Sequence, residues 1–97
     1  MKILVTDSAK RDLKSIQDYY YEQGIPEIAN NQISEVLERI ERLIDHPESG
    51  RVVPELNDTQ IRELISPPYR VVYSLTDHII QIIRVWRSER ILELPDS

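Results

Sequence analysis

The sequence predicts an α+β fold in which a helical hairpin packs on one face of an antiparallel sheet, with the elements in the order β-α-α-β-β-β. Three observations predict it. A short β-branched run opens the chain, two segments with helical apolar spacing follow, and the last third holds three strand-like runs. The length of 97 residues fits one domain spanning 1–97, and no repeat or composition break divides it.

The N-terminal run KILVT predicts a first strand over about residues 2–6, because it is short and rich in β-branched residues. Asp7 or Ser8 then offers a side-chain oxygen for the N-cap of a helix over roughly 8–22. The apolar residues of this segment are spaced by four, three and four, as on one helix face: Ala9, Leu13, Ile16 and Tyr20.

The second helix follows after only the residues EQGIP, so the two helices are expected to form an antiparallel hairpin. Gly24 suits a left-handed position after the first helix, and Pro26 suits the first turn of the second. Pro47 ends the second helix after about twenty residues. Its apolar stripe consists of Ala29, Ile33, Val36, Leu37, Ile40, Leu43 and Ile44.

Three strands are predicted after a loop-like middle segment, over 61–65, 69–75 and 79–86, with TDH as the turn of the last hairpin. Alternation in the middle strand predicts one face toward the helices, formed by Tyr69, Val71, Tyr73 and Leu75. Arg70 is then expected on the opposite, more open face. The last strand is apolar on both sides, which is typical of a central strand but leaves its faces unassigned.

Charge is unevenly distributed along the chain. The formal net charge is −5, yet residues 61–90 carry five arginines against three acids, and no lysine occurs after Lys14. Arginine presents a planar fork that suits carboxylates, phosphates and base edges. The C-terminal half therefore has the arginine content of a recognition surface, although the chain as a whole is negatively charged.

Composition excludes several classes of function. Without cysteine there is no disulfide or thiolate metal site, and two glycines are too few for a glycine-rich phosphate loop. His46 and His78 have no second ligand at metal spacing, so we expect neither a metal nor another cofactor. No serine has a histidine partner that would suggest a hydrolase triad. With no signal core and no membrane-length apolar segment, we expect a cytoplasmic protein.

The arginines at the end of the last strand are the main candidate for a site. Arg84, Arg87 and Arg90 are three residues apart, and together with Arg70 they are expected to converge on the uncovered side of the sheet. Such a surface would bind an anionic partner, with Trp86 as a core residue or an interface anchor. The alternative is that these arginines pair with carboxylates of the same chain, or cover the sheet with their alkyl stems.

Four segments, in order, resemble the RelE/ParE superfamily of bacterial toxins from type II toxin–antitoxin pairs: SAKRDLKSIQDYY, SGRVVPEL, IRELISPPYRVVYSL and IIQIIRVWRSER. The resemblance covers nearly the whole chain. It implies the small α+β fold of RelE/ParE toxins, in agreement with the predicted element order. It also implies one of two activities, ribosome-dependent cleavage of messenger RNA in RelE-like members or poisoning of DNA gyrase in ParE-like members.

The ribonuclease pattern is incomplete in this sequence. RelE-like members have a Lys-x-Lys pair where this chain has Ile61 and Glu63. Arg70, Arg87 and Arg90 match basic positions and would be the catalytic candidates of a ribonuclease. Other members place a histidine where Arg87 stands, and an arginine does not serve as a general base near neutral pH. A net charge of −5 also disfavours approach to ribosomal RNA.

The resemblance therefore favours a ParE-like inhibitor of DNA gyrase that catalyses no reaction of its own. The alternatives are a ribonuclease that acts on messenger RNA at the ribosome, or an inactive member that binds only its antitoxin. An acidic antitoxin segment is implied as partner. The binding residues would be Arg62, Arg70, Arg84, Trp86, Arg87 and Arg90.

Overall fold

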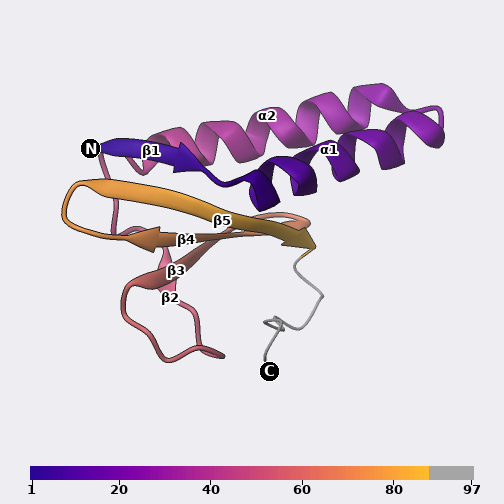
Figure 1. Ribbon diagram of the computed structural model, residues 1–97. Helices are drawn as coiled ribbons and strands as arrows, with labels where there is room; N and C mark the ends of the chain where they lie inside the picture. The colour runs from indigo at the N-terminus through magenta and orange to yellow at the C-terminus, as the bar shows by residue number, and fades with distance from the viewer. Residues whose placement is uncertain (88–97) are drawn as a thin grey trace.

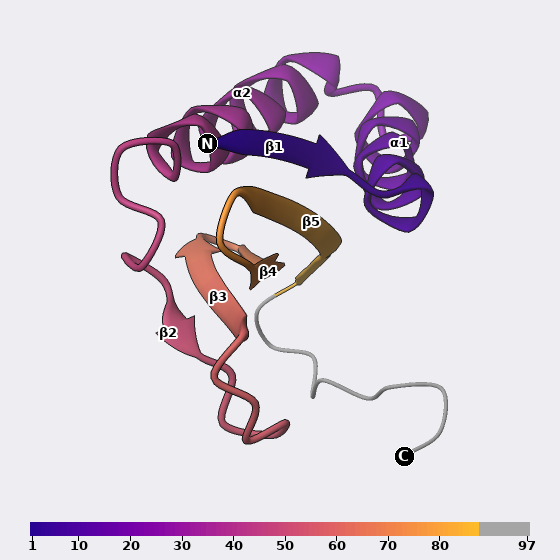
Figure 2. The same ribbon diagram turned by 60° about the vertical axis from the view of Figure 1, so that its left-hand side comes forward.

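The computed structural model describes residues 1–87 and places two helices on one face of a five-stranded sheet. The layers are visible in Figure 1, and Figure 2 shows the helices lying together on one side of the strands. The elements in chain order are β1 (Lys2–Val5), α1 (Asp7–Glu22), α2 (Pro26–Arg42), β2 (Arg51–Val52), β3 (Ile61–Ser66), β4 (Tyr69–Leu75) and β5 (Ile79–Arg87). The predicted fold class is confirmed.

The sheet has the strand order β1-β5-β4-β3-β2, so β5 lies inside the sheet between β1 and β4, as expected from its apolar residues on both sides. One pair differs from the antiparallel prediction, because β1 runs parallel to β5 with Ile3 opposite Ile80. Apolar alternation is the same for parallel and antiparallel strands, so the sequence carried no signal for this direction. The two-residue strand β2 also escaped prediction, since it is too short to show a period.

The helix boundaries depend on local chemistry at their ends. Thr6, rather than Asp7 or Ser8, is the N-cap of α1, and its Oγ1 accepts a hydrogen bond from the Ala9 amide at 3.1 Å. Gly24 adopts the predicted left-handed conformation, with φ of 76°. Helix α2 ends at Arg42, several residues before the predicted end at Pro47. Directly after Arg42, backbone amides donate to the carbonyls three residues earlier, so the chain continues as tight turns rather than as α-helix.

The main core lies between the helices and the sheet, where Val36 and Ile40 of α2 meet Val71 and Tyr73 of β4. The predicted helix-facing set of β4 is confirmed, with Leu75 packed at its margin. The predicted stripe of α2 holds only in part, because Leu37 and Ile44 remain exposed. The apolar face of α2 is therefore wider than the part of the helix that packs on the sheet.

The loop before β2 is anchored to β4 through Tyr73. Its hydroxyl donates a hydrogen bond to the Pro47 carbonyl at 2.9 Å and accepts one from the Gly50 amide at 3.0 Å. A Cβ at position 50 would lie 2.5 Å from the Tyr73 hydroxyl and 2.6 Å from the Glu63 carbonyl, so the backbone approaches this closely only because residue 50 is glycine. The segment after β2 then packs on the face of the sheet opposite the helices, where Val53 lies against Val72.

A β-bulge in β5 explains why its faces could not be assigned from alternation. Val72 pairs with Arg84 but Tyr73 pairs with Ile82, so Ile83 is the extra residue. Before the bulge Ile80 and Ile82 face the helices, and after it the inward positions are odd-numbered, beginning with Val85. The bulge therefore turns Arg84 and Trp86 to the face opposite the helices.

Candidate functional site

The predicted arginines do not converge on one face of the sheet, which corrects the central expectation from the sequence. Arg70 pairs across the strands with Trp86 and lies on the face opposite the helices, as does Arg84. Arg62 pairs with Tyr73 and Arg87 with Tyr69, so both share the helix-facing side of their strands. Arg90 lies outside the described residues. The bulge and the strand registers, which no local pattern reveals, cause this division.

Arg70 is on the predicted face, but that face is not open. Only 6% of the residue is exposed, because the segment after β2 folds over it and places Val53 against Val72. The Arg70 Nε donates to Glu63 Oε2 at 2.7 Å, and its Nη2 also pairs with that oxygen. Its two terminal nitrogens reach Glu55 at 3.1 and 3.3 Å. Burial opposes the charged form, but the bonds with Glu55 and Glu63 outweigh it and raise the pKa of Arg70.

Glu63 is the centre of this network, with 1% of the residue exposed. It also accepts a hydrogen bond from the Arg51 Nε at 2.7 Å, so the carboxylate joins β2, β3 and β4. Two guanidinium groups and two carboxylates thus balance their charges inside one network. Arg70 consequently contributes little charge to any partner that approaches this face.

Arg84 is likewise bound to a carboxylate of its own fold. Its Nε and Nη2 donate to the Asp12 carboxylate of α1 at 2.8 and 2.9 Å, and the guanidinium lies 4.5 Å from the centroid of the Trp86 ring. Asp12 also accepts a hydrogen bond from the Val85 amide at 2.9 Å, and the Thr6 hydroxyl donates to the Ile83 carbonyl at 3.0 Å. The start of α1 therefore satisfies the backbone groups that the bulge releases.

Arg62 binds main-chain oxygens rather than a carboxylate. Its Nη1 donates to the Gly50 carbonyl at 2.8 Å and, more weakly, to the Glu48 carbonyl at 3.4 Å. The side chain thereby holds the loop before β2 against the sheet. Arg62 therefore supports the loop and does not line the same surface as Trp86 and Arg87.

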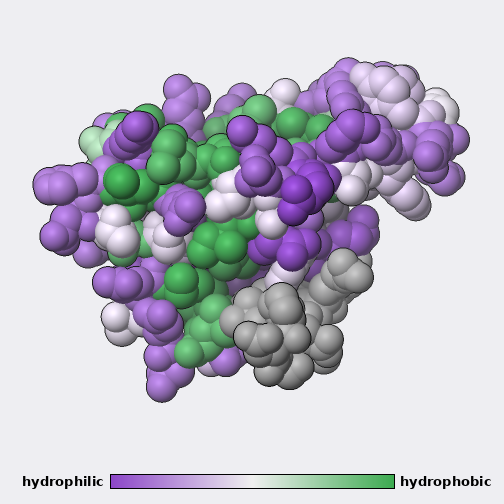
Figure 3. Space-filling view, in the orientation of Figure 1, coloured by the Kyte–Doolittle hydropathy of each residue, from purple (hydrophilic) through white to green (hydrophobic). Residues whose placement is uncertain are grey.

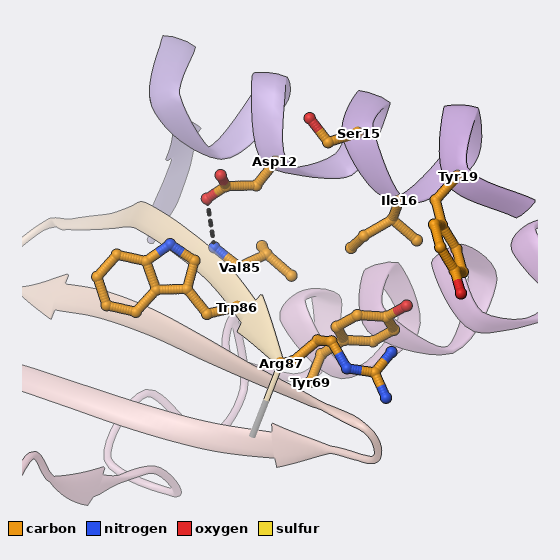
Figure 4. A pocket seen from close by; sticks show the side chains of 8 residues that line it. All are labelled: Asp12, Ser15, Ile16, Tyr19, Tyr69, Val85, Trp86 and Arg87. Carbon is orange, nitrogen blue, oxygen red and sulfur yellow. Dashed lines mark hydrogen bonds between the residues drawn. The ribbon is translucent and has the colours of Figure 1, made fainter. Parts of the chain in front are cut away.

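A groove of about 460 Å³ runs between α1 and the end of β5 and is the candidate site (Figure 4). We call it the α1–β5 groove; its lining residues are Asp12, Ser15, Ile16, Tyr19, Tyr69, Val85, Trp86 and Arg87. Apolar side chains from the helix and the strand form its floor, and Arg87 places a guanidinium at its end. Two of the predicted binding residues, Trp86 and Arg87, thus line this groove, although their side chains leave β5 on opposite faces.

Polar side chains surround the Arg87 end of this groove. A hydrogen bond with Tyr69 outweighs the effect of burial and, with help from Arg87 and Gln32, lowers the pKa of Tyr20. The guanidinium is therefore already held by neighbours on the helix side. It remains exposed enough to meet a carboxylate of a partner.

Sequence reasoning missed Asp12, Glu55 and Glu63 as partners of the arginines. Asp12 lies near the start of α1, where the helix dipole alone favours a carboxylate, and the acids of the middle loop follow no pattern. Glu63 did have a signal, because it stands where the resemblance leads one to expect a lysine. A carboxylate in place of a cation on a strand next to Arg70 points to an internal ion pair.

Within residues 1–87 no three potential metal-ligating side chains gather in one place. Across the same range, neither helix has the length and apolarity needed to cross a bilayer.

The family model for the ParE toxin of the type II toxin–antitoxin system parDE matches residues 3–92. No curated protein matches the chain significantly. Among solved structures, the chromosomal ParDE toxin–antitoxin system from P. aeruginosa superposes with a TM-score of 0.76 at 26% identity, covering 92% of this chain and 97% of that one.

Two structures of the E. coli DinJ–YafQ toxin–antitoxin complex also match. Their TM-scores are 0.61 and 0.62, at 15% and 13% identity, and they cover 89% of this chain and 91% and 90% of theirs. At these identities the likeness shows the fold alone.

Proposed function

Because this chain belongs to the family of ParE toxins of type II toxin–antitoxin systems, we propose that it arrests growth by binding and inhibiting DNA gyrase, without catalysing a reaction of its own. Gyrase acts on chromosomal DNA, so the proposal places the toxin in the cytoplasm. We further propose that a cognate antitoxin neutralises it; the similar structures are a ParDE toxin–antitoxin system and a DinJ–YafQ toxin–antitoxin complex.

The network around Arg70 is the observation that supports a non-catalytic toxin. A ribonuclease needs cations that hold phosphate and stabilise the leaving oxygen. Here Arg70 is buried against Glu63 and Glu55, and Glu63 occupies a position where RelE-like members have lysine. A phosphate approaching this face would meet a compensated ion network with two carboxylates, which disfavours RNA binding and cleavage.

The α1–β5 groove is the place we propose for the antitoxin. Its apolar floor suits the hydrophobic side chains of a short segment, and Arg87 at its end suits an acidic residue of that segment. Arg62, Arg70 and Arg84 do not line this groove. The proposed anchors in the described part of the chain are therefore Trp86 and Arg87.

The proposed target is tested with purified toxin and gyrase. We expect loss of supercoiling and accumulation of cleaved DNA complexes as toxin is added, and no codon-positioned cuts when transcripts are mapped by primer extension after induced expression. Codon-positioned cuts with undisturbed supercoiling would instead establish the ribonuclease alternative. Normal growth at high expression without antitoxin would establish an inactive member.

The antitoxin groove predicts a specific loss of affinity. Arg87→Glu should weaken antitoxin binding by on the order of 10-fold or more, because it replaces an attraction at the groove with repulsion of an acidic segment. Arg42→Glu changes the charge equally at an exposed site on α2, away from the groove, and is the matched control. Isothermal titration with the antitoxin measures both. Equal affinities for the two variants would remove Arg87 from the interface.

A further inference from the structure

The outer half of the helical hairpin, residues 15–38, carries an unusual charge. It contains five acids and no lysine or arginine, so this segment alone holds a charge equal to the formal net charge of the chain. The five acids are Asp18, Glu22, Glu27, Glu35 and Glu38. We call residues 15–38 the distal hairpin. Its tip projects beyond the edge of the sheet (Figure 1), and its surface in Figure 3 is hydrophilic over the projecting end.

Large apolar and aromatic side chains lie exposed among these acids. Tyr19 is 56% and Tyr21 50% exposed, and Ile25 and Ile28 at the turn into α2 are 37% and 38% exposed. The projecting end has no sheet beneath it, so folding alone does not cover these side chains. Exposed rings of this kind are typical anchors of protein interfaces.

The positions on α1 interleave acids and rings. Asp18 and Glu22 are four residues apart and share one helix face, and Tyr19 and Tyr21 flank that face on either side. The Asp18 carboxylate already forms an exposed ion pair with Lys14, with 3.1 Å between Asp18 Oδ2 and Lys14 Nζ. Glu22 lies one helical turn closer to the tip of the hairpin. The surface therefore offers negative charge beside aromatic contact area.

We propose that the distal hairpin docks on a surface of gyrase rich in lysine and arginine, an inference that rests on the proposed function. The occupant follows from charge complementarity. Nucleic acid and an acidic antitoxin segment are both repelled by five carboxylates. A second copy of the chain would bring the same acids face to face in a two-fold interface. A protein that itself binds DNA presents the cations that this surface lacks.

The proposal separates two surfaces of the toxin. The antitoxin occupies the α1–β5 groove, where Arg87 lies, and the target meets the distal hairpin. Tyr19 lines the groove and is also exposed beside the acids, so it is the point at which a bound antitoxin would interfere with the target.

The test uses full-length toxin and intact gyrase. Glu22→Gln, Glu27→Gln and Glu35→Gln combined remove three charges from the distal hairpin without changing side-chain size. The matched control, Glu41→Gln, Asp45→Asn and Glu48→Gln combined, removes three charges from exposed residues at the other end of the hairpin and beyond it. We expect the distal variant to bind gyrase on the order of 10-fold more weakly, to inhibit supercoiling correspondingly less, and to show a shallower salt dependence. The control should change affinity less than about 2-fold.

A second variant, Tyr21→Ser with Ile25→Ser, tests the apolar part of the surface and should also weaken gyrase binding. Both distal variants should keep wild-type affinity for the antitoxin, which reports an intact fold. If wild-type toxin inhibits gyrase and the distal variants inhibit it equally well, the docking surface is wrong and the proposed function stands. An equal loss in the control variant also overturns the docking surface. Failure of wild-type toxin to inhibit gyrase overturns both proposals.

Discussion

Glu63→Gln is expected to destabilise the protein by about 3 kcal/mol, because it removes the charge of the buried carboxylate that binds the buried Arg70 guanidinium. The variant keeps the size of the side chain, so the loss reports charge rather than a cavity. Urea unfolding followed by circular dichroism measures it. For a domain of this size, each kcal/mol corresponds to about 4–8 °C in Tm.

Two further variants decide whether the charge balance of the network is the cause. Glu63→Leu combined with Arg70→Met removes both buried charges and should recover much of the loss, since a buried pair replaced by apolar residues of similar volume is often neutral. Asp18→Asn breaks the exposed pair with Lys14 and should cost less than about 0.5 kcal/mol. If Glu63→Gln costs no more than Asp18→Asn, Arg70 is not held by Glu63 in solution.

Asp12→Ala is expected to cost about 2–4 kcal/mol, because it removes both bonds from Arg84 and leaves the Val85 amide without an acceptor. Asp12→Asn keeps a neutral acceptor for the amide and should lose about half as much. Asp7→Ala, in the exposed first turn of the same helix, tests the general effect of a carboxylate there and should cost less than about 1 kcal/mol.

The same substitution carries a functional consequence for the α1–β5 groove. Asp12 lines the groove and holds α1 against the end of β5, so its loss should weaken antitoxin binding even at temperatures where the variant is folded. Titration of the folded Asp12→Ala variant with antitoxin measures this effect. Wild-type affinity in a destabilised variant would show that the groove keeps its shape without Asp12.

Both of these variants concern ion pairs between different secondary-structure elements, and no local pattern in the sequence reveals which residues pair. The α+β class, the helical hairpin and the helix-facing residues of β4 were predictable, because each depends on a period of 3.6 or 2 within a short segment. The family was predictable from the segments that surround Glu63, Arg70 and Trp86. Each of these properties depends on residues that are close together in the sequence.

The distribution of the arginines depended on the tertiary structure alone. The bulge at Ile83 reverses which side chains of β5 face the helices, and the partner that binds Arg84 is Asp12, 72 residues earlier in the chain. The direction of β1 was equally invisible, because its partner strand β5 lies more than seventy residues later in the chain. An ion pair or a strand register of this kind forms only when segments far apart in the sequence come together in the folded protein. The sequence therefore determined which charges are present, and the fold determined which of them are left for a partner.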